Sequence, residues 1–321
     1  MSVLVFADNS EGIFKKTACE LVSYGKQLAK GANTKLVVVT INSNDTSILS
    51  TYGAERILNV KNSQLESFNA RAYAHCICQA AEAEGSDTVI VDSSTNGMYL
   101  APILAVKLKA GYAANTVDLP ESYSPLVVKR KAFSSKGYNF SEIKSDIKLI
   151  GLAKNSFGLV EEEVNGTEHL FEVNLNEDDF NIQSVSIEKS TGEVSIADAD
   201  IVVSGGRGLK GPENWTMIEE LAEVLGAATA CSKPVSDLGW RPHSEHVGQT
   251  GKPVTSNLYI AIAISGAIQH LAGVNSSKVK VVINSDPEAP FFKAADYGIV
   301  GDAFTVVPEL IQKLKEFKSS V

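Results

Sequence analysis

The sequence lacks the features that mark several classes of protein. Only 4 of its 321 residues are cysteine, too few and too scattered for a secreted disulfide framework, so a reducing compartment is expected. No uninterrupted apolar run approaches the roughly 20 residues of a membrane-spanning helix. Lysine and arginine number 29 against 38 acidic residues, a net charge of -9, which disfavours a broad contact with nucleic acid or anionic lipid.

The first residues show no targeting signal. They contain no basic leader, no small-residue cleavage site and no arginine-rich presequence, and they read instead as a strand. We therefore expect a cytoplasmic protein.

Two groups of residues raise the possibility of a metal site. Cys76 and Cys78 lie in an expected helix, where a spacing of two residues turns the side chains about 200° apart. His243 and His246 flank Glu245, but further ligands at zinc-site spacing are missing. We interpret the cysteines as buried packing residues and the histidines as part of a polar loop.

The first part of the chain alternates short β-branched runs with helical stretches, a pattern typical of a mostly parallel sheet. Strands are expected at 3–6, 36–41 and 88–91, and apolar residues at helical spacing between them predict helices that face the sheet. After Gly111 the runs 126–133, 147–153, 170–173 and 182–187 are strand-like with no long helix between them. They predict an antiparallel extension.

A polar, turn-forming segment at 189–193 precedes a second alternating pattern. Strands are expected at 201–203, 258–264, 279–283 and 297–300, and helices at about 212–225, near Ala267 and from Pro308. The fold class is therefore α/β with two domains, an N-terminal domain over 1–188 and a parallel-sheet domain over 189–321.

A glycine-rich turn follows the first strand of the second domain. Gly206-x-Gly208-x-x-Gly211 stands between that strand and a helix with Pro212 in its first turn. Glycines let the backbone approach a diphosphate, and a helix start offers free amides. A nucleotide site and a tight turn without a ligand both fit this pattern. About 20 residues on, the sequence reads Ala230-Cys231-Ser232-Lys233, without the acid that a nicotinamide site usually places on the ribose.

Two later segments add hydrogen-bonding groups. The loop 247–251 places Gln249 and Thr250 between flexible glycines, and Ser265-Gly266 interrupts an apolar strand before a helix that carries His270. A serine N-cap at this helix would leave amides for an anion or a developing negative charge. Together with Arg207 and Lys233, these residues predict a pocket of donors and cations suited to an electron-rich ring.

These segments, with Asn284-x-Asp286-Pro287 and Ala295-Asp296-Tyr297-Gly298, resemble the FAD-binding domain of the electron transfer flavoprotein alpha subunit. The resemblance implies one FAD in the second domain, with Thr250 as donor to flavin N5 and His270 at the N1/O2 edge. Asn284 and Asp302 match positions that hold the adenosine end. Lys233 stands where the family has arginine, so the charge is kept and the planar fork is lost. The matching cofactor-binding residues are Arg207, Ser232, Lys233, Val247, Gly248, Gln249, Thr250, Ser265, Gly266, Ala267, Ile268, Gln269, His270, Asn284 and Asp302.

The resemblance also implies a function without substrate chemistry. An alpha subunit pairs through its first domain with a beta subunit, in which AMP or a second FAD is expected. The heterodimer takes single electrons from flavin dehydrogenases, such as the acyl-CoA dehydrogenases of fatty acid β-oxidation, and passes them to a quinone oxidoreductase of the respiratory chain. Two alternatives stay open: an NAD-dependent oxidoreductase that uses the Gly206 turn, and a regulatory nucleotide-binding module without redox function.

Overall fold

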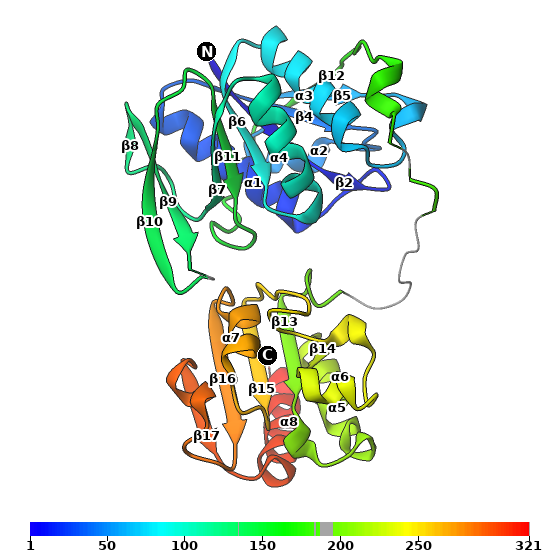
Figure 1. Cartoon of the computed structure of the whole chain (residues 1–321), viewed down its shortest axis with the longest axis vertical. Coiled ribbons are helices and arrows are strands. Elements are labelled where there is room, and N and C mark those ends of the chain that lie inside the picture. The colour runs from blue at the N-terminus through cyan, green and yellow to red at the C-terminus, as the bar shows by residue number, and fades with distance from the viewer. Residues whose placement is uncertain (134, 183, 187–194, 321) are drawn as a thin grey trace. The chain divides into compact units, whose positions relative to one another are not determined.

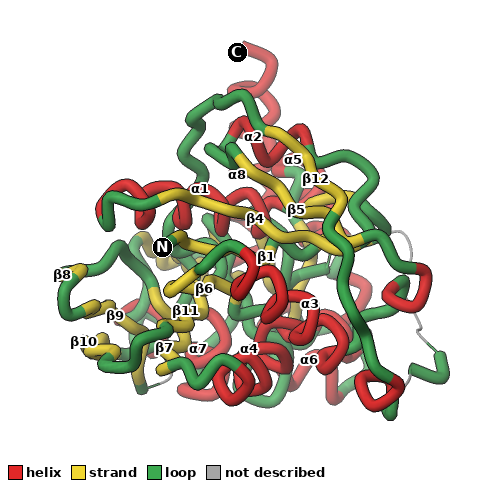
Figure 2. Tube along the Cα trace, turned by 90° about the horizontal axis from the view of Figure 1, so that it is seen from above, coloured by secondary structure: helices red, strands yellow, loops and turns green. Residues whose placement is uncertain are grey.

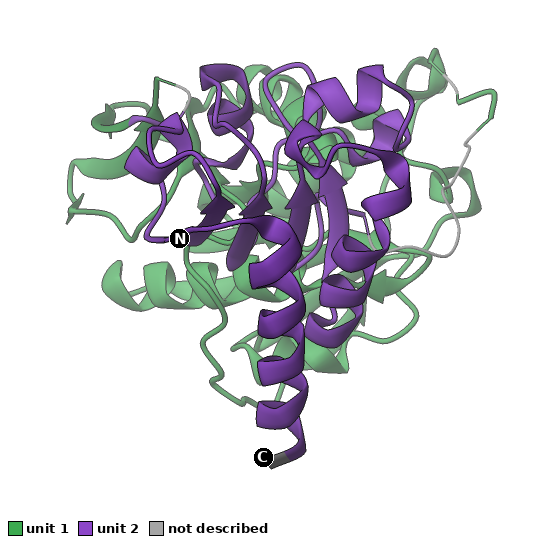
Figure 3. Ribbon diagram, turned by 90° about the horizontal axis from the view of Figure 1, so that it is seen from below, with its two compact units in different colours: residues 1–133, 137–188 green, residues 134–136, 189–321 purple. Residues whose placement is uncertain are grey.

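The computed structural model describes residues 1–133, 135–182, 184–186 and 195–320. The chain divides into two compact units, residues 1–133 with 137–188, and residues 134–136 with 189–321 (Figure 3). The domain boundary expected at 188/189 stays a prediction. The expected linker turn at 189–193 lies outside the described residues.

The first unit is built on a sheet whose central strand, β1 (Ser2–Phe6), pairs in parallel with both β4 and β6 (Figure 1). The strand order is β10-β9-β7-β11-β6-β1-β4-β5-β12, and β8 pairs with β9. The parallel strands besides β1 are β4 (Lys35–Ile41), β5 (Arg56–Val60), β6 (Ser86–Asp92), β7 (Gly111–Thr116), β11 (Lys148–Leu152) and β12 (Thr167–Leu170). A small hairpin of β2 (Asn9–Ser10) and β3 (Ile13–Phe14) follows β1.

Helices cover both faces of this sheet. Val3 and Val5 pack in one core with helix α1 (Lys16–Gly31), whereas Leu4 and Phe6 pack in another with α3 (Ala70–Ala83) and α4 (Thr95–Lys107) (Figure 2). A strand buried on both faces is a nearly continuous apolar run, as β1 is from Val3 to Phe6. The short helix α2 (Ser47–Thr51) joins the α1 side through Leu49.

The antiparallel extension is smaller than the sequence predicts. It consists of β8 (Ser122–Tyr123), β9 (Leu126–Ala132) and β10 (Gly137–Ile143). The run 147–153 instead forms β11, which lies between β6 and β7 in the parallel sheet, and 170–173 contributes only its first residue to β12. Residues 182 and 184–186 form no strand, and 183 and 187 lie outside the described residues. An apolar run in the sequence does not show whether its neighbouring strands are parallel or antiparallel to it. The prediction for 147–153 was wrong for this reason.

The second unit is a parallel five-stranded sheet in the order β14-β13-β15-β16-β17. The strands are β13 (Ile201–Gly205), β14 (Ala228–Cys231), β15 (Leu258–Ile262), β16 (Val279–Asn284) and β17 (Tyr297–Val300). Helices α5 (Thr216–Leu225) and α8 (Ala303–Ser320) share one core with the sheet, and α7 (Ile268–Val274) lies against the other face. The short helix α6 (Lys233–Asp237) follows β14. The predicted two-domain α/β fold class is confirmed.

Helix α8 begins five residues before the expected start at Pro308. The Asp302 carboxylate accepts a hydrogen bond from the Phe304 amide at 3.1 Å, and the Asp302 carbonyl accepts from Thr305 and Val306. The proline lies inside the helix, in its second turn. In the described part of the chain, none of the helices combines the length and the apolar character needed to cross a membrane.

Candidate functional site

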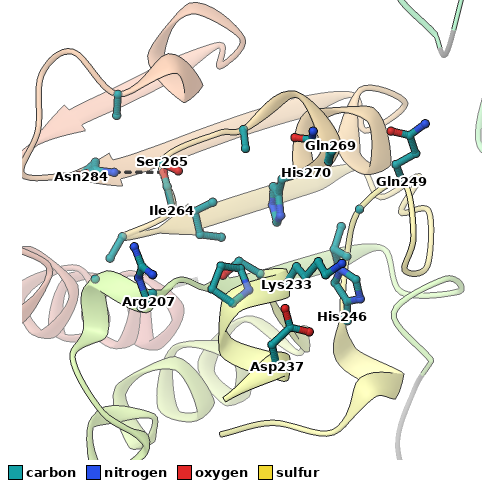
Figure 4. A pocket seen from close by; sticks show the side chains of 18 of the residues that line it. Arg207, Lys233, Asp237, His246, Gln249, Ile264, Ser265, Gln269, His270 and Asn284 are labelled. Atoms are coloured by element: carbon teal, nitrogen blue, oxygen red, sulfur yellow. Dashed lines mark hydrogen bonds between the residues drawn. The ribbon is translucent and has the colours of Figure 1, made fainter. Parts of the chain in front are cut away.

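A cavity of about 670 Å³ lies at the carboxyl ends of the strands of the second unit (Figure 4). Strand β13 pairs with β14 on one side and β15 on the other, so the chain reverses its direction of winding at β13. Ligands of open parallel sheets bind outside such a point, and small-molecule sites have volumes of about 300–1,000 Å³. The lining residues are Arg207, Gly208, Ser232, Lys233, Pro234, Asp237, His246, Val247, Gly248, Gln249, Thr250, Ala263, Ile264, Ser265, Ala267, Gln269, His270, Asn284, Asp286 and Ala289.

Most of the predicted binding residues therefore meet at one cavity, although they come from separate parts of the second unit. The exceptions are Gly266, Ile268 and Asp302, which do not line it. Ile268 is 66% exposed. Asp302 caps α8, and its assignment to an adenosine group stays a prediction.

The glycine-rich turn does not end in a helix as expected. A Cβ atom at Gly206 would overlap the Ala263 carbonyl, so glycine permits the close approach of the two loops that follow β13 and β15. After a 3-10 turn at Arg207–Leu209, however, the chain buries Leu209 and Trp215, and α5 starts only at Thr216. Gly211 does not line the cavity. The start of α5, which would bind the diphosphate in a dinucleotide site, thus does not directly follow the glycine motif.

The turn after β15 differs from its prediction too. Ala263 has a φ of 55°, a left-handed conformation that is costly for a residue with a side chain. Gly266 has a φ of +84°, and a Cβ there would lie 2.5 Å from the Phe291 nitrogen. The residue that precedes α7 is Ala267, so Ser265 is no N-cap. Its exposed hydroxyl group instead lines the cavity.

Asn284 holds this turn from the neighbouring strand. Its Nδ2 donates to the Ile264 carbonyl at 3.0 Å, and its Oδ1 accepts from the Asp286 amide at 3.0 Å (Figure 4). The side chain lines the cavity and uses both ends of its amide to fix the wall.

His270 is buried in the cavity wall, with its Nε2 2.9 Å from the Tyr259 hydroxyl oxygen. Its Nδ1 is buried and forms no hydrogen bond of ordinary geometry. Burial, and to a smaller extent His246, lower the pKa of His270 to about 4, while the nearby Val247 backbone opposes the shift. His270 is therefore neutral at pH 7 in the protein without a ligand.

The two predicted cations, Arg207 and Lys233, are exposed and line the cavity. Two carboxylates that the sequence analysis did not assign, Asp237 and Asp286, line it as well. The formal charges of these four side chains cancel, so the cavity offers separate positive and negative positions.

The loop 247–251 is anchored from two directions. The Val247 amide donates to the Cys231 carbonyl at 3.0 Å, and the Gln249 amide donates to the Gln269 carbonyl at 2.7 Å. Gly248 has a φ of +151°, and its backbone lies close enough to Gly273 of α7 that a Cβ there would meet it at 2.7 Å. The anchors leave the Gln249 and Thr250 side chains exposed at the cavity.

The interpretation of 243–246 as a polar loop is wrong for two of its residues. Glu245 is 4% exposed, and Arg241 binds it through two hydrogen bonds of 2.6 and 2.9 Å. His246 is 2% exposed and lines the cavity. Their proximity in sequence to Val247-Gly248-Gln249-Thr250 was the available signal, but polar residues do not show from sequence alone that they are buried.

The cysteines are all buried, as the packing interpretation predicts. Burial raises the pKa of Cys76 to about 12 and that of Cys78 to about 11, so both thiols are protonated. Among the described residues, no cluster of three or more histidine, cysteine, aspartate or glutamate side chains could hold a metal ion.

Comparisons with known proteins agree with the resemblance. Residues 3–177 match the electron transfer flavoprotein domain, and residues 195–275 match the electron transfer flavoprotein FAD-binding domain. The chain is 36% identical to the electron transfer flavoprotein subunit alpha of Thermoanaerobacterium thermosaccharolyticum, over 98% of both chains. It is 35% identical to that of Bacillus subtilis, over 98% of this chain and 97% of the relative. An acryloyl-CoA reductase electron transfer subunit beta from Anaerotignum propionicum is 30% identical, over 99% and 96%.

Proposed function

This chain belongs to the alpha-subunit family of electron transfer flavoproteins, and on that premise we propose that its cavity binds one FAD and that the protein relays single electrons. The observation that carries the proposal is the convergence of Arg207, Thr250 and His270, from three separate segments, on one cavity. An electron carrier of this kind performs no substrate chemistry of its own.

The residues at the cavity fit a flavin nucleotide. An isoalloxazine needs an apolar slot with donors at its edge, and Val247, Ala263 and Ile264 lie beside hydroxyl, amide and imidazole groups. The exposed Arg207 provides a cation for a phosphate group. The buried Nδ1 of His270 lacks a hydrogen-bond partner, a cost that a ligand acceptor would relieve after a small movement.

Bound FAD supplies one-electron redox chemistry, and the protein sets its energetics. Negative charge that develops in the cavity is stabilised by the donors and cations that line it. We assign the Thr250 hydroxyl to the N5 edge and His270 to the N1/O2 edge. Each hydrogen bond to a charged group contributes roughly 1.5–3 kcal/mol. Lys233 holds a positive charge over this region, and Ser232, Gln249 and Ser265 position the ring and the ribityl chain.

The proposal includes partners. Subunit naming among the relatives points to a beta subunit, and we propose a heterodimer whose beta chain holds AMP or a second FAD. Flavin dehydrogenases, such as those of fatty acid β-oxidation, would donate the electrons. A quinone oxidoreductase would accept them.

A different acceptor has one observation in its favour. A relative that covers nearly the whole chain is named as an electron transfer subunit of acryloyl-CoA reductase. An acyl-CoA reductase is therefore a second candidate for the protein that receives the electrons. Reduction of purified complex followed by addition of each candidate acceptor separates the two cases, because only the true acceptor reoxidises it rapidly.

The test of the central proposal is an absorption spectrum of the protein, coexpressed with its beta subunit, during stepwise anaerobic reduction. We expect copurified FAD and a one-electron-reduced species before full reduction. A flavin-free complex that also fails to take up added FAD would contradict the proposal. It would favour the alternative of an NAD-dependent oxidoreductase that binds its dinucleotide at the Gly206 turn.

A further inference from the structure

The cavity contains a second histidine that the resemblance assigns to no role. His246 follows a 3-10 turn at His243–Glu245, and its backbone bridges to Cys231 at the end of β14. The side chain is 2% exposed and lines the cavity, where Lys233 from α6 reaches toward it (Figure 4). It also supports the 247–251 loop, since a Cβ at Gly251 would lie 2.9 Å from its Cγ.

The hydrogen bonds of His246 are incomplete. Its Nδ1 is buried and has no hydrogen-bond partner. Its ring lies 5.2 Å, centroid to centroid, from the ring of His243, whose side chain is exposed to solvent. A proton therefore has a short route from water to His246 by way of a neighbouring imidazole.

Several charged and titratable groups lie around His246. Lys233 and Asp237 act on it from α6, His243 from the preceding turn and His270 from α7, and the Cys231 backbone in β14 bridges to its backbone. The Glu245 carboxylate beside it is held by Arg241. Burial and then His243 lower the pKa of His246, Asp237 opposes the shift and Lys233 adds to it. His246 is thus neutral at pH 7 and responds to any new charge in the cavity.

His270 is less suited to accept a proton. Its Nε2 already contacts the Tyr259 hydroxyl group, and the burial of its side chain lowers its pKa to about 4. His246 has an exposed imidazole beside it and the Asp237 carboxylate nearby. Negative charge placed in the cavity favours the protonated form of both rings, and of the two it is His246 that has an exposed imidazole next to it.

Resting on the proposed function, we propose that His246 takes up the proton that compensates the negative charge when the bound flavin gains one electron. The electron comes from a reduced flavin dehydrogenase, or from dithionite in the cuvette. The proton comes from solvent through His243 and forms an N–H bond on the unprotonated nitrogen of His246. One negative and one positive charge enter together, so the net charge of the cavity is unchanged and no proton is added to the flavin.

The experiment is a spectroelectrochemical titration of the FAD-loaded complex between about pH 6 and pH 8, the range in which histidines titrate. For wild type we expect the one-electron equilibrium constant to change tenfold per pH unit over part of this range, which is about 59 mV per unit. His246→Gln should lose this dependence and still bind FAD. His169→Gln is the matched control, because His169 lies on β12 in the first unit, and it should keep the wild-type slope.

His243→Gln tests the path of the proton separately from the residue that accepts it. It should keep the equilibrium slope, because the proton still reaches His246, but slow the approach to equilibrium after rapid reduction. An unchanged slope in His246→Gln would overturn the proposal, as would a pH-independent potential in wild type. Both results leave FAD binding intact, so they are distinct from failure of the proposed function, in which wild type binds no FAD.

A second measurement covers the case in which His246→Gln does not take up FAD. Reduction of wild type at an electrode, which itself releases no proton, in weakly buffered solution with a pH indicator should consume about one proton per electron near neutral pH. Consumption of none would overturn the proposal without any variant. His246→Asn gives a second non-titrating side chain and should abolish the uptake.

Discussion

The Tyr259 hydroxyl oxygen lies 2.9 Å from Nε2 of His270, and both side chains are buried. Tyr259 belongs to β15 and His270 to α7, so this contact ties the helix that borders the cavity to the centre of the sheet. Burial raises the pKa of Tyr259, which keeps its proton available for the contact.

Removal of that hydroxyl group leaves a buried imidazole nitrogen without its partner. Tyr259→Phe should lower the free energy of unfolding of the second unit by about 1–3 kcal/mol. Both tryptophans, Trp215 and Trp240, lie in this unit, so tryptophan fluorescence during urea unfolding measures it selectively. Tyr297→Phe is the control, because Tyr297 is 67% exposed, and an equal loss in the two variants would contradict the assignment.

Acid should weaken the second unit through His270. Its pKa is lowered from 6.5 to about 4 in the folded protein, so the unfolded chain binds more protons between these values. The contribution of neutral His270 to the free energy of unfolding is therefore complete above pH 6.5. It is lost as the pH falls toward 4, and the total loss is about 3 kcal/mol. His270→Gln should flatten this part of the profile in urea unfolding at several pH values. A variant as acid-sensitive as wild type would show that other groups are responsible.

The turn before α7 requires glycine at 266. Gly266→Ala combines a φ of +84° with a contact of 2.5 Å to the Phe291 nitrogen, so we expect it to displace Ser265 and weaken FAD binding. Gly226→Ala provides the comparison, since Gly226 has a φ of +65° and open space around it. It should cost only about 1 kcal/mol and leave the FAD dissociation constant unchanged. Equal FAD affinities in the two variants would be inconsistent with a role of this turn in the site.

The Arg241–Glu245 pair supports the segment between α6 and the 247–251 loop. Arg241→Met leaves the carboxylate of Glu245, 6% exposed at the side chain, without its cation. We expect a loss near the lower end of the roughly 3–5 kcal/mol found for broken buried pairs, because Arg241 itself is partly exposed. Lys315→Met, which breaks the exposed pair with Glu220, should cost at most about 1 kcal/mol. Thermal unfolding of both variants tests the difference, and similar losses would mean that the buried pair contributes little.

Lysine at 233 is expected to hold the flavin less firmly than arginine would. Lys233→Arg keeps the charge and adds a planar group that stacks on an aromatic ring, worth about 0.5–1 kcal/mol at an exposed position. The FAD dissociation constant should fall by about 2- to 5-fold, and the one-electron-reduced flavin should accumulate to a higher level. Isothermal titration measures the dissociation constant, and the absorption spectrum during anaerobic reduction measures the yield of one-electron-reduced flavin. Identical values in wild type and Lys233→Arg would place the side chain of residue 233 away from the flavin ring.

The sequence by itself determined the fold class and the segments that border the cavity. Alternation of buried strands with amphipathic helices admits few architectures, and loops that follow parallel strands meet at one edge of the sheet. Arg207, Ser232 and Ser265 could therefore be placed together from their positions after β13, β14 and β15. The local pattern was sufficient because the carboxyl ends of parallel strands lie at the same edge of a sheet, whatever the order of the strands.

The tertiary structure alone decided the partners of each strand and the neutral state of His246 and His270. The run 147–153 has the same composition whether it joins a parallel or an antiparallel neighbour, and only the sheet places β11 between β6 and β7. His246 stands in a polar stretch of the sequence and His270 in a mostly apolar one, and both are buried. Their neutral state depends on the removal of water by residues distant in the chain, and desolvation is a property of the packed molecule rather than of any local pattern.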